Sequence, residues 1–186
     1  MDWKTAVYEN LKRRRKILFD KYSPLISELR VKLETGDRRA AVMWALKLSE
    51  DAVSLLETHH PMEQRPRKCL DSARLWSQGR LKMPAAKADI LACHAAAKEL
   101  SDPAAAALCH AVAQGCSTVH TVRHAIGLAM YELTALMLCR GCDAVEKRAE
   151  EYSRTYDYIA AGISDFETEW AEFLQPENNM TNPPET

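Results

Sequence analysis

The most apolar stretch of the chain runs from Thr118 to Cys139, where Glu132 is the only charged residue after Ala125. Apolar residues recur at steps of three and four on two sides of this stretch, as they do in a helix that is covered on both sides. One of these sides carries Val119, Val122, Ile126, Ala129, Leu133 and Leu136. We therefore predict a buried central helix over residues 118–139, with other helices packed around it.

Proline and glycine separate the remaining helical intervals, and no interval shows the alternating β-branched pattern of a strand. Ala, Leu, Glu, Lys and Arg fill these intervals, and all five favour helix. The separating residues are Pro24, Gly36, Pro61, Pro66, Gly79, Pro84, Pro103, Gly115 and Gly141. The pattern predicts an all-α, single-domain array of about seven or eight helices over residues 1–174.

The last helical interval has a heptad pattern, with apolar residues at alternating steps of four and three from Val145 to Phe173. It predicts a C-terminal helix over about residues 142–174. Such a seam packs within its own domain or joins two chains, so a homodimer through residues 145–173 and a self-assembling structural module stay open as alternatives. The polar, proline-rich tail at 175–186 is predicted to be disordered.

Charge and composition exclude several classes of partner. Lys and Arg number 25 against 26 Asp and Glu, so no overall field attracts nucleic acid, although Lys12–Lys16 are five consecutive cations. No apolar run approaches the roughly 20 residues that span a bilayer, and the charged N-terminus is unlike a signal peptide. We expect a cytoplasmic protein that binds neither nucleic acid nor membrane, with its six cysteines as reduced thiols.

The sequence shows no arrangement typical of an enzyme. It lacks a nucleophile elbow, a glycine-rich phosphate loop and a carboxylate pair placed for catalysis, so we predict no enzymatic activity and no cofactor. His120 and His124 have the spacing with which two helical imidazoles share a metal. Thr121 stands where a zinc protease has its glutamate. We predict no metal site, and a metal-binding helical bundle that uses these two histidines stays open as an alternative.

Two groups of charged residues call for partners within the fold. Arg65, Arg67 and Lys68 lie at the start of a predicted helix, where cations oppose the helix dipole and need a carboxylate or a bound anion. Glu132 lies in the apolar central helix, and we expect Arg67 or Arg74 to neutralise it, with the histidines in the same network. A further pattern, Cys93-His94-Ala95 repeated as Cys109-His110-Ala111, is too short to indicate an internal repeat.

Residues 38–133 carry a series of short motifs whose order and spacing resemble the immunity-five-like family, found beside bacterial polymorphic toxins. The motifs are Trp44-Ala45, His60-Pro61, Arg65-Pro66-Arg67, Ala73-Arg74 with Trp76, Asp102 to Ala105, His120 with His124-Ala125, and Tyr131. The resemblance implies an all-helical, non-enzymatic immunity protein that binds and neutralises a cognate toxin. Its candidate residues for a partner surface or a polar network are Arg65, Arg67, Arg74, Trp76, His120, His124, Tyr131 and Glu132.

Overall fold

The computed structural model describes residues 2–164 and 169–176, and within these ranges the protein is all-α, as predicted. Two short 3-10 helices, η1 (Pro24–Ile26) and η2 (Glu172–Leu174), accompany eight α-helices. The α-helices are α1 (Trp3–Lys12), α2 (Ser27–Thr35), α3 (Arg38–His59), α4 (Arg65–Ser77), α5 (Met83–Glu99), α6 (Pro103–Ser117), α7 (Arg123–Arg140) and α8 (Cys142–Ala161). None of these helices is long and apolar enough to cross a membrane.

Local sequence signals explain where several helices begin. The Asp37 carboxylate accepts a hydrogen bond from the Arg39 backbone N–H (2.7 Å) and caps α3. Asp102 caps α6 in the same way, through the Ala104 N–H (2.9 Å). Prolines occupy the first turns of α4, α5 and α6, where a missing N–H leaves no hydrogen bond unmade.

Helix α6 packs against four other helices, α3, α4, α5 and α7. Its alanines allow this close approach, and so does Gly115, which lies inside α6 and not between helices as we expected. A Cβ atom at Gly115 would collide with the Ser49 hydroxyl of α3 and the Leu128 side chain of α7. The helix predicted to be central, α7, therefore shares the centre of the fold with α6, and it begins at Arg123 and not at Thr118.

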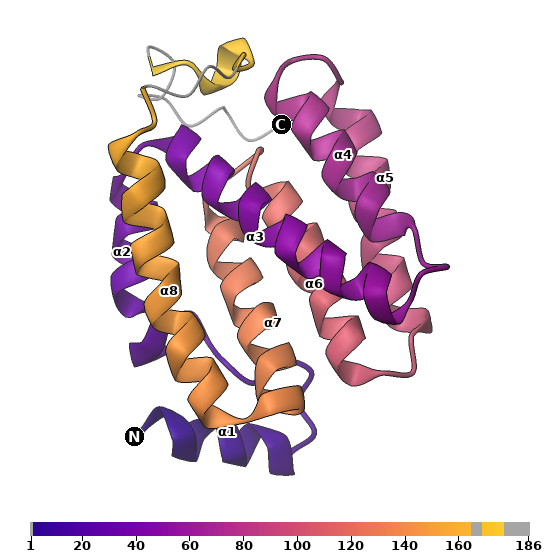
Figure 1. The fold of residues 1–186 in the computed structure, drawn as a ribbon, viewed down its shortest axis with the longest axis vertical. Coiled ribbons are helices and arrows are strands. Elements are labelled where there is room, and N and C mark those ends of the chain that lie inside the picture. The colour runs from indigo at the N-terminus through magenta and orange to yellow at the C-terminus, as the bar shows by residue number, and fades with distance from the viewer. Residues whose placement is uncertain (1, 165–168, 177–186) are drawn as a thin grey trace.

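Helix α3 separates two groups of buried side chains, and Figure 1 shows α4 and α5 on one side of it and α2, α7 and α8 on the other. One group includes Leu56 of α3 with residues of α4, α5 and α6. The other is centred on Trp44 of α3, whose ring meets that of Tyr152 edge-on at 5.5 Å and whose Nε1–H donates to the Tyr152 carbonyl (3.1 Å). Helix α3 therefore contributes buried side chains to both groups.

The predicted C-terminal helix over residues 142–174 is too long. Helix α8 ends at Ala161, Gly162 takes the C-cap position, and the next helix among the described residues is η2, while residues 165–168 of the predicted helix lie outside the described ranges. The seam residues of α8, among them Val145, Tyr152 and Tyr156, are buried against α2, α3 and α7 of the same chain. The seam is thus used inside the protein, and the structure gives no support to a homodimer through residues 145–173.

The segment after α8 returns to α4. The Ala171 N–H donates to the Ser77 carbonyl (2.8 Å), and Leu174 is fully buried among residues of α4, α5 and α6. Gly79 permits the turn after α4 with a φ of 73°. Most of the tail at 175–186, for which we predicted disorder, lies outside the described residues.

Candidate functional site

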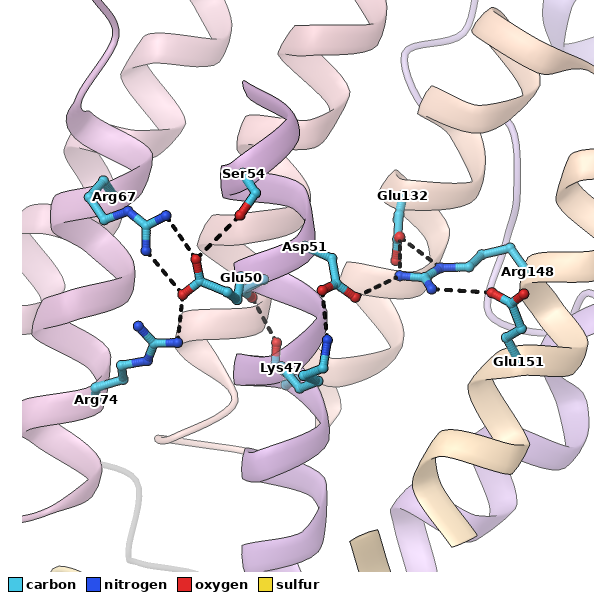
Figure 2. Close-up of polar contacts among 11 residues, drawn as sticks. Lys47, Glu50, Asp51, Ser54, Arg67, Arg74, Glu132, Arg148 and Glu151 are labelled. Carbon is cyan, nitrogen blue, oxygen red and sulfur yellow. Dashed lines mark hydrogen bonds and ion pairs between the residues drawn. The ribbon is translucent and has the colours of Figure 1, made fainter. Parts of the chain in front are cut away.

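The arginines of α4 are held by carboxylates of the same chain. Arg67 donates through Nε and Nη2 to the two carboxylate oxygens of Glu57, both at 2.8 Å. Arg67 and Arg74 also bind Glu50 of α3, with Arg74 Nη2 2.6 Å from Glu50 Oε2 (Figure 2). The hydrogen bonds from Arg67 and then Arg74 lower the pKa of Glu50 to about 2. These bonds supply the compensation predicted for cations at this helix start.

Arg65 is similarly occupied. It donates through Nε to Glu63 (2.8 Å) and through Nη2 to Glu99 at the end of α5 (2.7 Å). Lys68 pairs with Asp89 (3.0 Å). The three arginines and this lysine therefore tie α4 to its neighbours, and their geometry favours a structural role over partner binding.

Glu132 has a different partner from the one predicted. Arg148 of α8, and not Arg67 or Arg74, donates to Glu132 Oε1 through Nη2 (2.7 Å) and Nε (2.9 Å). The Tyr152 hydroxyl donates to Glu132 Oε2 (2.9 Å). Figure 2 shows Arg148 between Glu132, Asp51 and Glu151. The prediction was wrong because the α4 arginines and Glu132 lie on opposite sides of α3. Glu50 points towards Arg67 and Arg74, whereas the next residue, Asp51, points towards the cluster of Arg148 and Glu132.

The Glu132 carboxylate is buried, with 9% of its side chain exposed against 21% for Arg148. Burial raises the pKa of Glu132, and the charge and hydrogen bonds of Arg148 act against this rise. A hollow of about 330 Å³ lies beside the pair and is also lined by Leu55, Leu136 and Lys147. Because each oxygen of Glu132 already accepts a hydrogen bond, the pair stabilises the contact of α7 with α8 without a ligand.

Two candidate residues, Trp76 and His120, meet in an open groove of about 760 Å³, here called the aromatic groove. Their rings lie nearly parallel (20°) with centroids 6.3 Å apart, and the Phe173 ring is 6.3 Å from that of Trp76. Arg38 fixes this arrangement, since its Nη2 donates to the carbonyls of Val119 and His120, both at 2.9 Å. The groove is lined by Arg38, Trp76, Gly79, Leu81, Lys82, Met83, His120, Ala171, Glu172 and Phe173.

Among the described residues, the charged side chains that line the aromatic groove are the cations Arg38 and Lys82 and the anion Glu172. The Arg38 guanidinium lies 5.6 Å from the Phe173 ring centre and donates to the Phe173 carbonyl (3.3 Å). Burial lowers the pKa of Arg38. Lys82 and Met83 are exposed at the start of α5. The groove thus combines stacked aromatic rings with charged residues of both signs and an accessible apolar rim.

The structure separates His120 from His124. His120 precedes α7 and stacks on Trp76, whereas His124 lies within α7, with its Nδ1 hydrogen-bonded to Gln114 Oε1 of α6 (2.8 Å). The helical spacing on which the metal alternative rested is therefore absent. In the described ranges, no group of three or more His, Cys, Asp or Glu is arranged to hold a metal ion.

A second group of polar rings, here called the histidine face, consists of His94, His110, His124 and Tyr131. His94 Nδ1 and His110 Nδ1 are 2.8 Å apart, and the Tyr131 ring lies 4.9 Å from that of His110. Burial, followed by the charge of His110, lowers the pKa of His94 to about 4. The two paired histidines come from the repeated Cys-His-Ala triplets.

Sequence reasoning missed several of these residues. Arg148 was not considered as a partner of Glu132, although it lies sixteen positions later on the next helix. Phe173 was assigned to the seam of a long helix, because the heptad pattern continues past Gly162. The repeat of Cys-His-Ala was the one available signal for the histidine pair, and it was set aside as too short.

These features define a class of protein: an all-α protein with an open groove lined by Trp76, Phe173, His120 and Arg38. Residues 31–161, more than two thirds of the chain, match the family described as "Imm-5 like putative immunity protein", and the chain belongs to this family. The match confirms the resemblance and extends it through α8. The groove residues Ala171–Phe173 lie beyond the matched region. No curated protein and no solved structure matches the chain.

Proposed function

We propose that the protein binds a cognate bacterial toxin and neutralises it by covering the toxin's active site, with no chemical step of its own. Family membership supports the immunity role, since the family is described by immunity and not by a reaction. The observation that carries the proposal is the composition of the aromatic groove. Tryptophan and arginine, represented here by Trp76 and Arg38, are among the residues most enriched at interface hot spots.

The rim of the groove supplies the surface that a partner would bury. Phe173 is 37% exposed and Met83 is 42% exposed, so two large apolar side chains lie open beside the exposed cation Lys82. Trp76, only 5% exposed, forms the floor. An apolar side chain of the toxin would bury surface against Phe173 and Met83, while a carboxylate at its edge would face Lys82.

The test uses a candidate toxin domain from a gene beside that of this protein, because the family resemblance implies a toxin as neighbour. Co-expression in a bacterial host should restore growth, and calorimetry with the purified toxin domain should give a saturable complex. Phe173→Ala and Met83→Ala should each weaken binding about tenfold, because truncation of a hot-spot residue costs more than about 1 kcal/mol. Lys82→Glu should slow association without unfolding the protein.

Tyr158→Ala is the matched control, since Tyr158 is an aromatic residue of α8 that is 77% exposed and outside the groove. It should protect cells as well as the unaltered protein does. If the unaltered protein gives neither protection nor a complex, the function is wrong. If the groove variants protect and bind as the control does, the toxin binds elsewhere.

The compartment is part of the proposal. All six cysteines are free, and four of them, Cys69, Cys93, Cys109 and Cys116, are buried. Free thiols are typical of proteins in a reducing compartment. We therefore place the complex with the toxin in the cytoplasm.

A further inference from the structure

The histidine face offers polar atoms that the fold does not use. The ring centres of His94 and His110 are 5.1 Å apart, and their Nδ1 atoms are 2.8 Å apart. The difference is about the sum of the two ring radii, so the two nitrogens point at each other in a hydrogen bond. In the described part of the chain, no hydrogen bond involves Nε2 of His94, His110 or His124, or the Tyr131 hydroxyl. The buried side-chain atoms of the described residues that lack a hydrogen-bond partner belong to other residues: Ser23, Arg30, Arg38 and Tyr156. The four atoms of the histidine face are therefore accessible to solvent.

A run of cations lies just before a segment that contacts α7 near the histidine face: the Leu18 N–H donates to Thr134 Oγ1 (3.1 Å), and Thr134 is three positions after Tyr131. Arg13, Arg14, Arg15 and Lys16 are all exposed, and none of them pairs with a carboxylate of the described residues. After the effect of burial, the charges of Lys16 and Lys98 lower the pKa of His110, so both lysines lie within electrostatic reach of it. The charged groups that lower the pKa values of His94, His110 and His124 are lysines and other histidines, and no carboxylate of the described residues is among them. The local field is positive.

Arg14 is held in an unfavourable backbone conformation. The Arg14 N–H donates to the Leu11 carbonyl (2.9 Å) and the Arg15 N–H to the Asn10 carbonyl (3.0 Å), the two bonds of a Schellman motif at the end of α1. Arg14 takes the left-handed position of this motif, with φ 51°, where glycine is the usual residue. An exposed side chain at a strained position that makes no hydrogen bond or ion pair with the described residues indicates a role outside the fold.

We propose that Arg13–Lys16 and the histidine face form one docking surface for an acidic segment of a protein partner. Charge complementarity argues for the acidic partner, and the solvent-reaching ring nitrogens and phenol supply hydrogen bonds for its carboxylates. A protein fits better than a nucleic acid because exposed carboxylates, Asp20 and Glu99, lie close in sequence to Lys16 and Lys98, and the whole chain has a net charge of −1. This surface is separate from the aromatic groove, and the proposal does not rest on the toxin.

The first experiment measures fluorescence anisotropy with a short labelled oligoglutamate peptide, an oligolysine peptide and a duplex DNA of similar length. Oligoglutamate should bind saturably, and its affinity should fall about tenfold as salt rises from low to high concentration, since exposed charges are screened. Absence of saturable binding would overturn the proposal. Equal binding of oligolysine, or tighter binding of the DNA at the same salt, would also overturn it.

Two variants separate binding from folding. Arg14→Gly should raise the melting temperature by about 2–4 °C, because glycine relieves the strain at φ 51°, and yet weaken oligoglutamate binding about threefold. Tyr131→Phe keeps the ring against His110 and removes only the hydroxyl, and it should weaken binding about threefold at an unchanged melting temperature.

Lys87→Ala is the control, because Lys87 is an exposed cation of α5 about three turns before Lys98. It should bind oligoglutamate as the unaltered protein does. If Arg14→Gly and Tyr131→Phe also bind like the unaltered protein, the surface is not the docking site. If Lys87→Ala weakens binding as much as they do, the attraction is unspecific and the proposal fails.

Discussion

Replacing Glu132 with glutamine tests the ion pair that joins α7 to α8. Glutamine keeps the shape of the side chain and an oxygen that can accept from Tyr152, but it removes the negative charge that faces Arg148. Removal of one partner from a fully buried pair costs about 3–5 kcal/mol. The cost here should be lower, about 2–3 kcal/mol, because Arg148 is 21% exposed and keeps Asp51 (3.5 Å) and Glu151 (3.3 Å).

In a protein of this length, 2–3 kcal/mol corresponds to a fall of about 5–10 °C in melting temperature. Circular dichroism melts at neutral pH, supported by urea titration, would measure it. Glu151→Gln is the matched control: its carboxylate is 38% exposed and binds the same arginine, so the loss should be below about 1 kcal/mol. In a double-mutant cycle with Arg148→Met, the two losses should be less than additive, because they remove the same interaction.

A Glu132→Gln protein that melts within about 1 °C of the unaltered protein would refute this reasoning. That result would mean that burial, which raises the pKa of Glu132, already keeps the carboxyl neutral in the folded state. The charge of Arg148 would then be balanced by Asp51 and Glu151 alone.

Three further predictions concern acid stability and metal content. The folded-state pKa of Glu50, about 2, is below its usual 4.5, so its contribution is complete above pH 4.5 and is lost as pH falls towards 2; urea titrations should show a shallower loss for Glu50→Gln. The pKa of His94 is lowered from 6.5 to about 4, so stability should fall as pH drops through that interval, and less steeply in His94→Gln. Elemental analysis of protein purified without chelators should find less than about 0.1 metal per chain, and one zinc per chain that is lost in His120→Ala would restore the metal alternative.

The sequence alone was enough to predict where a helix begins when the signal lies in the residues next to that end. Asp37, Asp102 and the prolines after Arg65, Met83 and Asp102 act through the first turn of their own helix, so their effect is visible in the linear chain. The end of α8 was not predicted, because Tyr156, Ile159 and Trp170 continue the apolar spacing across Gly162. Glycine was the one signal for the break, and the heptad pattern outweighed it.

The candidate site was predictable only in part, because its contacts join distant segments. Trp76 and His120 were identified through the resemblance, but their meeting depends on Arg38, which lies 82 positions before His120. Phe173 reaches the groove only because the chain returns to α4 after α8. The partner of Glu132 was missed for a similar reason, since the turn at Gly141 decides which residue of α8 faces α7.

The position of α3 between the two buried groups has a consequence for folding. Trp44 completes one group and Leu56 the other, so neither half of the molecule can bury its apolar surface while α3 is unfolded. We expect the two halves to unfold together in one cooperative transition. A fragment that ends before α7 would keep α3 but leave Trp44 without Tyr152, and should therefore be prone to aggregation in place of folding on its own.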